Sequence, residues 1–159
     1  ILIPDFASND LSGDLSHNLR LAYPPEYYYM GHVTDLRSQP CQPDIDYYIS
    51  LSGPEPQKSY LAEKILQQLD QLSGKIIISL AQPEKIYTKK IKENIWLYSF
   101  VTRKQQQEFF NRAKLIITRS GYTTLMELAE LKKKALLIPT PGQTEQEYLA
   151  DYQQSIANT

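Results

Sequence analysis

The 159-residue chain has little of the chemistry from which disulfide frameworks, zinc sites and histidine-dependent active sites are built. It contains one cysteine, Cys41, and two histidines, so an internal disulfide is excluded and neither a zinc cluster nor a cysteine–histidine dyad is predicted. The lone cysteine favours a reducing, cytoplasmic location. With 17 basic and 18 acidic side chains, the formal charge of -1 provides no field that would attract nucleic acid. We therefore expect no nucleic-acid partner, no metal and no other cofactor.

Long hydrophobic runs are also missing. No apolar stretch approaches the roughly 20 residues that cross a bilayer, and no charged-then-apolar secretory signal opens the chain. The composition is 42% hydrophobic and 22% charged, which is ordinary for a globular domain. A chain of this length buries roughly 70% of the surface that its unfolded form exposes, so a core needs no metal or disulfide to stabilise it.

From residue 45 onward, short apolar runs alternate with polar segments of helical period. The apolar runs predict strands at 45–52, 75–80, 95–98, 115–118 and 135–138. Apolar residues at helical spacing predict helices around 61–72, 109–113, 125–129 and 148–156. Several runs are continuous in Ile, Leu and Val, as in strands covered on both faces. This alternation predicts an α/β fold with a Rossmann-like, doubly wound parallel sheet, in which a ligand lies outside the carboxyl ends of the strands.

The segment before this pattern is different. Residues 1–43 are rich in proline and show no sustained helical period, so we expect connecting segments with short strands at 1–3 and 27–33. The chain also begins inside an apolar run without Met. We therefore expect a fragment of a longer protein, with 1–43 as the end of a preceding domain and its linker, and with 44–159 as a second domain shortened at its C-terminus.

The turn after the fourth predicted strand is the most informative. Gly121 at a helix N-terminus would let a phosphate approach the backbone amides, and the hydroxyls of Ser120, Thr123 and Thr124 could add donors. Glu127, one turn further, could accept hydrogen bonds from the vicinal hydroxyls of a ribose. The alternative interpretation is structural: Ser120 or Thr123 caps the helix, and Glu127 completes a capping pattern.

Three other turns carry weaker signals. Ser52-Gly53 can present amides to an anion, but neither a dinucleotide fingerprint nor a P-loop is present, so a plain turn is the alternative. Phe100-Val101 could clasp a flat base through backbone groups. Gln143, Glu145 and Gln146 offer amides and a carboxylate that suit a neutral polyol such as a sugar, although they could simply form a solvated first helical turn.

Taken together and in this order, the turns resemble the C-terminal domain of family 28 glycosyltransferases. The resemblance spans about 45–150 and is carried by Arg119-Ser120-Gly121 through Leu128 and by Leu137-Ile138-Pro139 through Gln146. It implies one half of a GT-B architecture, in which two Rossmann-like halves face each other and the second half binds a UDP-sugar donor. It also implies no metal at the donor phosphates, and the absence of an Asp-x-Asp pattern agrees with this.

The resemblance implies a role for each matched position. It places Ser52, Gly53, Ser120, Gly121, Thr123 and Thr124 at the donor diphosphate, Glu127 at the ribose, Phe100 and Val101 at the uracil, and Gln143, Glu145 and Gln146 at the donor sugar. Two positions depart from the family pattern, because Glu145 stands where Gln is frequent and Leu149 where Asn is expected. These departures leave the identity of the sugar open.

The expected function is therefore transfer of a hexosyl or N-acetylhexosaminyl group from a UDP-sugar to an unidentified acceptor. The partners would be the donor, the protein's own N-terminal acceptor domain and, through a lipid-linked acceptor, the inner face of a membrane. The catalytic base is unassigned and expected in the missing half, so this fragment alone should be inactive. Two alternatives stay open: a non-catalytic nucleotide-binding subunit that pairs with a separate acceptor-binding chain, and a sugar-nucleotide epimerase.

Overall fold

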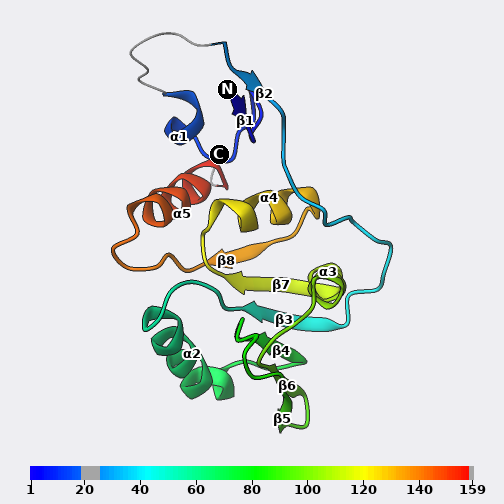
Figure 1. Ribbon diagram of the computed structural model, residues 1–159. Coiled ribbons are helices and arrows are strands. Elements are labelled where there is room, and N and C mark those ends of the chain that lie inside the picture. Colours follow the sequence, from blue (N-terminus) through cyan, green and yellow to red (C-terminus); the bar gives the residue numbers. More distant parts are fainter. Residues whose placement is uncertain (19–25, 158–159) are drawn as a thin grey trace.

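The computed structural model describes residues 1–18 and 26–157, and its main feature is a six-stranded sheet with helices on both faces (Figure 1). The strands lie in the order β5-β6-β4-β3-β7-β8. Their bounds are β3 Ile45–Ser50, β4 Ile76–Ser79, β5 Thr88–Lys92, β6 Ile95–Tyr98, β7 Ala113–Thr118 and β8 Ala135–Leu137. All neighbours are parallel except β5 and β6. The predicted doubly wound α/β fold is confirmed.

Helices cover opposite faces of the sheet, and all but the last of them connect parallel strands. They are α2 Gln57–Gln68, continued by the 3-10 helix η1 Leu69–Gln71, α3 Arg103–Arg112, α4 Tyr122–Glu130 and α5 Thr144–Ala157. Adjacent residues of β3 point to opposite faces. Tyr48 is buried with Phe110 of α3 and Leu149 of α5, whereas Ile49 is buried with Leu69 on the face that α2 covers. Continuous apolar strands are therefore required here, because both faces of the sheet are buried.

The carboxyl ends of five strands are aligned at one edge of the sheet. Tyr98 of β6 pairs with Ser79 of β4, and Ser79 pairs with Ser50 of β3. On the other side of β3, Ser50 pairs with Thr118 of β7, which pairs with Leu137 of β8. The strand order reverses between β3 and β7, and such a switch point is where open α/β sheets bind ligands.

The amino-terminal residues form a small unit beside α5. Strands β1 (Leu2–Ile3) and β2 (Tyr28–Tyr29) pair in parallel, and the short helix α1 spans Asp14–His17. The backbone amide of Asp14 donates to the Tyr148 hydroxyl of α5 at 2.8 Å, and the Tyr122 hydroxyl of α4 donates to the Pro4 carbonyl at 2.6 Å. Short strands are present within both expected ranges, 1–3 and 27–33, and each covers two residues.

One segment differs from its sequence-based interpretation. A run of lysines such as 89–92 is typical of a solvated helix end or turn, but here it lies in β5, which pairs antiparallel with β6 at the sheet edge. Its lysines are exposed, and Lys90 lies over the ring of Trp96, with 5.5 Å between Nζ and the ring centroid. A polar edge strand has no buried face and therefore no alternating apolar pattern, while its lysines discourage further strand pairing.

Candidate functional site

The loops after β7 and β8 enclose a cleft of about 420 Å³ at the carboxyl edge of the sheet. Gly121 of the first loop lines it together with residues 142–146 of the second. Four residues predicted for the diphosphate and the donor sugar therefore lie together: Gly121, Gln143, Glu145 and Gln146. The other predicted residues do not line this cleft: Ser52, Gly53, Phe100, Val101, Ser120, Thr123, Thr124 and Glu127.

The start of α4 leaves its backbone amides without a side-chain cap. Gly121 occupies the N-cap position in an extended conformation, and no side chain accepts a hydrogen bond there. The interpretation that Ser120 or Thr123 caps this helix is therefore wrong. A Cβ atom added to Gly121 would have no neighbour within 4 Å, so the backbone is open on this side. Free amides and the helix dipole make such a terminus attractive to an anion.

A hydrogen-bond network fixes the second loop against the first. The hydroxyl of Ser120, which is fully buried, donates to the carbonyl of Gln146 at 2.7 Å. The side-chain oxygen of Gln146 accepts from the amide of Thr140 at 3.0 Å, and its side-chain nitrogen donates to Gln143. Ser120 thus lies beneath the loop and positions it. The exposed Thr123 and the half-buried Thr124 occupy the first turn of α4.

Glu127 is buried and ion-paired with a residue that sequence reasoning missed. Its Oε1 accepts from Nη1 of Arg103 at 2.6 Å, and Arg103 also pairs with Asp35 in the segment leading to β3. Hydrogen bonding to Asp35 and Glu127 raises the pKa of Arg103, and the same bond to Arg103 lowers the pKa of Asp35. Arg103 is the first residue of α3, where Thr102 and Gln105 form a reciprocal capping box. Because Arg103 and Glu127 are 24 residues apart, no local pattern reveals the pair.

Arg119 is the second residue without a sequence-based role. It follows β7 directly and is only 3% exposed. Its Nη1 donates to the carbonyls of Ile138 and Pro139 at 3.3 and 2.9 Å, and its Nη2 donates to the carbonyl of Gln57 at 3.1 Å. Burial lowers the pKa of this guanidinium. Its position immediately after an apolar strand and its place at the start of the Arg119-Ser120-Gly121 motif are the sequence signals that could have singled it out.

The remaining predicted residues lie on the same edge of the sheet but apart from the cleft. Ser52 and Gly53 are exposed in the loop after β3, where Gly53 adopts φ +107. Phe100 and Val101 follow β6; both are half-buried, and Val101 packs against the core. The structure thus brings Gly121 together with the three residues predicted for the sugar and places the other predicted residues outside this cleft.

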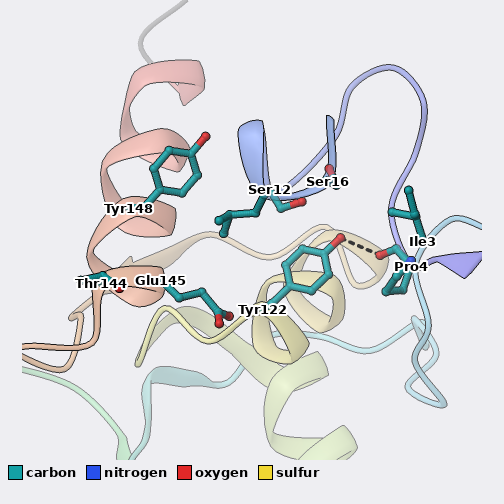
Figure 2. Close-up of a pocket in the computed structure, with 9 residues that line it drawn as sticks. Ile3, Pro4, Ser12, Ser16, Tyr122, Thr144, Glu145 and Tyr148 are labelled. Carbon is teal, nitrogen blue, oxygen red and sulfur yellow. Dashed lines mark hydrogen bonds between the residues drawn. The ribbon is translucent and has the colours of Figure 1, made fainter. Parts of the chain in front are cut away.

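A second cleft, of about 610 Å³, adjoins the first (Figure 2). Its walls come from the amino-terminal unit on one side and from Tyr122, Thr144, Glu145 and Tyr148 on the other. Figure 2 shows the Glu145 side chain extending from α5 toward the ring of Tyr122. Thr144 and Glu145 line both clefts, so the two spaces meet at the start of α5.

Among residues 1–18 and 26–157, no group of three or more His, Cys, Asp or Glu side chains is placed to hold a metal ion. In the same described part of the chain, no helix is both long enough and apolar enough to cross a membrane.

A doubly wound α/β domain with an open helix N-terminus beside its switch point is a typical nucleotide-binding architecture. The family model of the glycosyltransferase family 28 C-terminal domain matches residues 55–158, which is well over half of the chain. The chain therefore belongs to this family, whose domain binds a sugar donor in glycosyltransferases. Comparisons with curated proteins and with solved structures gave no match.

Proposed function

We propose that the chain is the donor-binding half of a glycosyltransferase that transfers a hexosyl or N-acetylhexosaminyl group from a UDP-sugar. The observation that carries this proposal is the uncapped N-terminus of α4 facing the cleft lined by Gly121 and residues 142–146. Negative charge grows on the leaving diphosphate during transfer, and fixed backbone amides can stabilise that charge without rearranging. The same surface therefore serves both binding and departure of the nucleotide.

The proposed contacts follow the arrangement along the carboxyl edge. The diphosphate lies at Ser52-Gly53 and at the start of α4, where Gly121 allows close approach and Thr123 and Thr124 add hydroxyl groups. The uracil lies at the backbone of Phe100-Val101. The sugar faces Gln143, Glu145 and Gln146, which line the cleft.

Glu127 is proposed to accept the ribose hydroxyls. Arg103 holds one of its carboxylate oxygens, so the carboxylate has a defined orientation before ligand arrives. A buried, oriented acceptor loses little freedom on binding, which favours affinity.

The acceptor is proposed to approach through the neighbouring cleft, because Thr144 and Glu145 belong to both walls. Residues 1–43 would then be the end of the protein's own acceptor domain, which would also supply the catalytic base. No metal is required in this scheme, because the α4 amides face the diphosphate. A lipid-linked acceptor would bring the protein to the cytoplasmic face of a membrane.

Calorimetric titration with UDP and 2′-deoxy-UDP tests the proposal. The unmodified chain should bind UDP more tightly, and Glu127→Ala should lose about tenfold or more in UDP affinity while removing the preference for the 2′-hydroxyl. Gly121→Ala should weaken both ligands, although its Cβ meets nothing within 4 Å in the free protein.

Thermal unfolding of each variant serves as the control for folding. Gly121→Ala should cost at most about 1 kcal/mol, the difference between Gly and Ala at an N-cap. The proposal fails if UDP does not bind, or if the unmodified chain and Glu127→Ala bind it equally.

A further inference from the structure

Arg119 joins the three loops that surround the switch point of the sheet. It leaves the end of β7, holds two carbonyls of the loop after β8, and holds the carbonyl of Gln57 at the start of α2, which follows the β3 loop. The guanidinium therefore bridges the β3 and β7 sides of the switch point. Among the described arginines, Arg119 alone donates hydrogen bonds to the backbone carbonyls of two of these loops.

The charge of Arg119 is not balanced inside the described part of the chain. Every ion pair recorded there involves other residues, and its hydrogen-bond partners are neutral carbonyls. Burying an unpaired charge is costly, and proteins normally pair it or neutralise it. An anion bound at the adjacent loops would provide the missing counter-charge.

Unpartnered polar atoms gather at the same place. Buried side-chain atoms without a hydrogen bond, within the described residues, include Nε of Arg119, Oγ1 of Thr140 and Oε1 of Gln57. Thr140 is 1% exposed and lies just beneath the open turn at Gly53, since a Cβ added to Gly53 would be 3.7 Å from its hydroxyl. Buried polar groups are rarely left unsatisfied in folded proteins, so two unused donors beside a proposed anion site point to a ligand.

We infer that Arg119 is a positioning residue that joins the donor-site loops. Its buried positive charge makes the site prefer a diphosphate to an uncharged nucleoside. The Thr140 hydroxyl is a neutral hydrogen-bond donor beside it. This inference rests on the proposed function and deepens it. The preference for a charged ligand would then come from the Arg119 side chain as well as from the backbone amides of α4.

A ligand series of increasing charge separates this role from simple loop anchoring. The affinities of uridine, UMP and UDP are measured by calorimetry for the unmodified protein and for Arg119→Met, Arg119→Lys and Thr140→Val. The affinity gain from uridine to UDP should shrink by about tenfold or more in Arg119→Met, because the lost charge acts only on charged ligands. Arg119→Lys, which keeps the charge, should retain most of the gain.

Thr140→Val keeps the shape of the side chain and removes a hydroxyl that has no partner. It should leave the thermal stability unchanged or higher, yet weaken UDP severalfold and uridine hardly at all. Arg112→Met is the matched control, since it removes an arginine whose ion pairs lie just before β3 and within α3. It should leave the uridine-to-UDP gain unchanged.

The outcomes separate the two ideas. Equal losses for uridine and UDP in Arg119→Met would mean that Arg119 only anchors loops, and this would overturn the inference. If Arg119→Met does not fold, unchanged UDP affinity in Thr140→Val or a collapsed gain in Arg119→Lys would overturn it instead. If the unmodified protein binds uridine and UDP alike, the charge inference fails while nucleoside binding stands. If it binds neither, the proposed function itself fails.

Discussion

At the scale of single residues, the ion pair between Arg103 and Glu127 allows a prediction of how much the free energy of unfolding changes when Arg103 is removed. Glu127 is buried, with a 5% exposed side chain, whereas Arg103 is 41% exposed. Removing Arg103 leaves a buried carboxylate without its partner, and we expect Arg103→Ala to lower the free energy of unfolding by about 1–3 kcal/mol. Urea unfolding measures this loss.

The Glu127→Gln variant provides the control for that measurement. A neutral amide in place of the carboxylate removes the unpaired charge, so Arg103→Ala should cost less in the Glu127→Gln background. A double-mutant cycle with a coupling energy near zero would show that the ion pair contributes nothing measurable.

The positions of residues at this site could be predicted only where they follow from local spacing. Gly121 could be found because it lies in the turn after an apolar strand, and Gln146 because it lies in the first turn of the helix that follows the next strand. The burial of Arg119 and the partner of Glu127 depend on contacts between separate loops and helices, and no local pattern encodes them. The capping alternative was wrong because Gly121 itself takes the N-cap position.

At the scale of elements, the start of α3 controls where Arg103 lies. Thr102 accepts a hydrogen bond from the Gln105 amide, and the Gln105 side chain accepts from the Thr102 amide. Replacing this N-cap with alanine typically costs about 1 kcal/mol, and we expect that loss for Thr102→Ala. Thr102→Ser should retain most of the stability.

The Thr102→Ala substitution should also change the affinity of the site for UDP. A frayed first turn of α3 releases Arg103, so Thr102→Ala should also weaken UDP binding, whereas Thr102→Ser should not. Calorimetry on both variants measures this effect. Equal UDP affinity in the two variants, together with the expected stability loss, would show that the cap acts on folding alone.

Most elements could be predicted because a sheet buried on both faces requires continuous apolar strands. One exception is β5, whose sequence Thr88–Lys92 is mostly exposed and basic. Its strand conformation comes from pairing with β6 across a short turn. Tertiary pairing, and not an alternating pattern, therefore decides the structure of an edge strand.

At the scale of the whole molecule, the edge of the sheet formed by the carboxyl ends of the strands differs from the edge formed by their amino ends. The carboxyl edge carries the candidate site, with exposed turns and a buried arginine, Arg119, that has no carboxylate partner among the described residues. The opposite edge is closed by ion pairs: Asp44 accepts from Arg112 and Lys75, and Asp46 accepts from Lys114. These contacts link the beginnings of β3, β4 and β7. These ion pairs therefore lie away from the surface proposed to bind the donor.

This division predicts a pH dependence of stability that is separate from ligand binding. The hydrogen bonds from Arg112 and Lys75 lower the pKa of Asp44 well below its usual range, and Lys114 lowers the pKa of Asp46. A pKa lowered by folding means that the unfolded chain binds more protons in acid. The stabilisation is therefore complete above about pH 5 and declines as the pH falls below about 4, the usual value for an unfolded Asp.

Urea unfolding at pH 5.5 and pH 3.5 measures this decline, and Asp44→Asn isolates the share of one carboxylate. Because the Asp44 side chain is 45% exposed, solvent screens the pair, and its share should be no more than about 1 kcal/mol. Asp44→Asn should flatten the pH profile by that amount, and added salt should flatten the profile of the unmodified chain. Since Asp44 lies at the edge opposite the site, the variant should bind UDP with unchanged affinity. A weakened UDP affinity would mean that the two edges of the sheet are coupled.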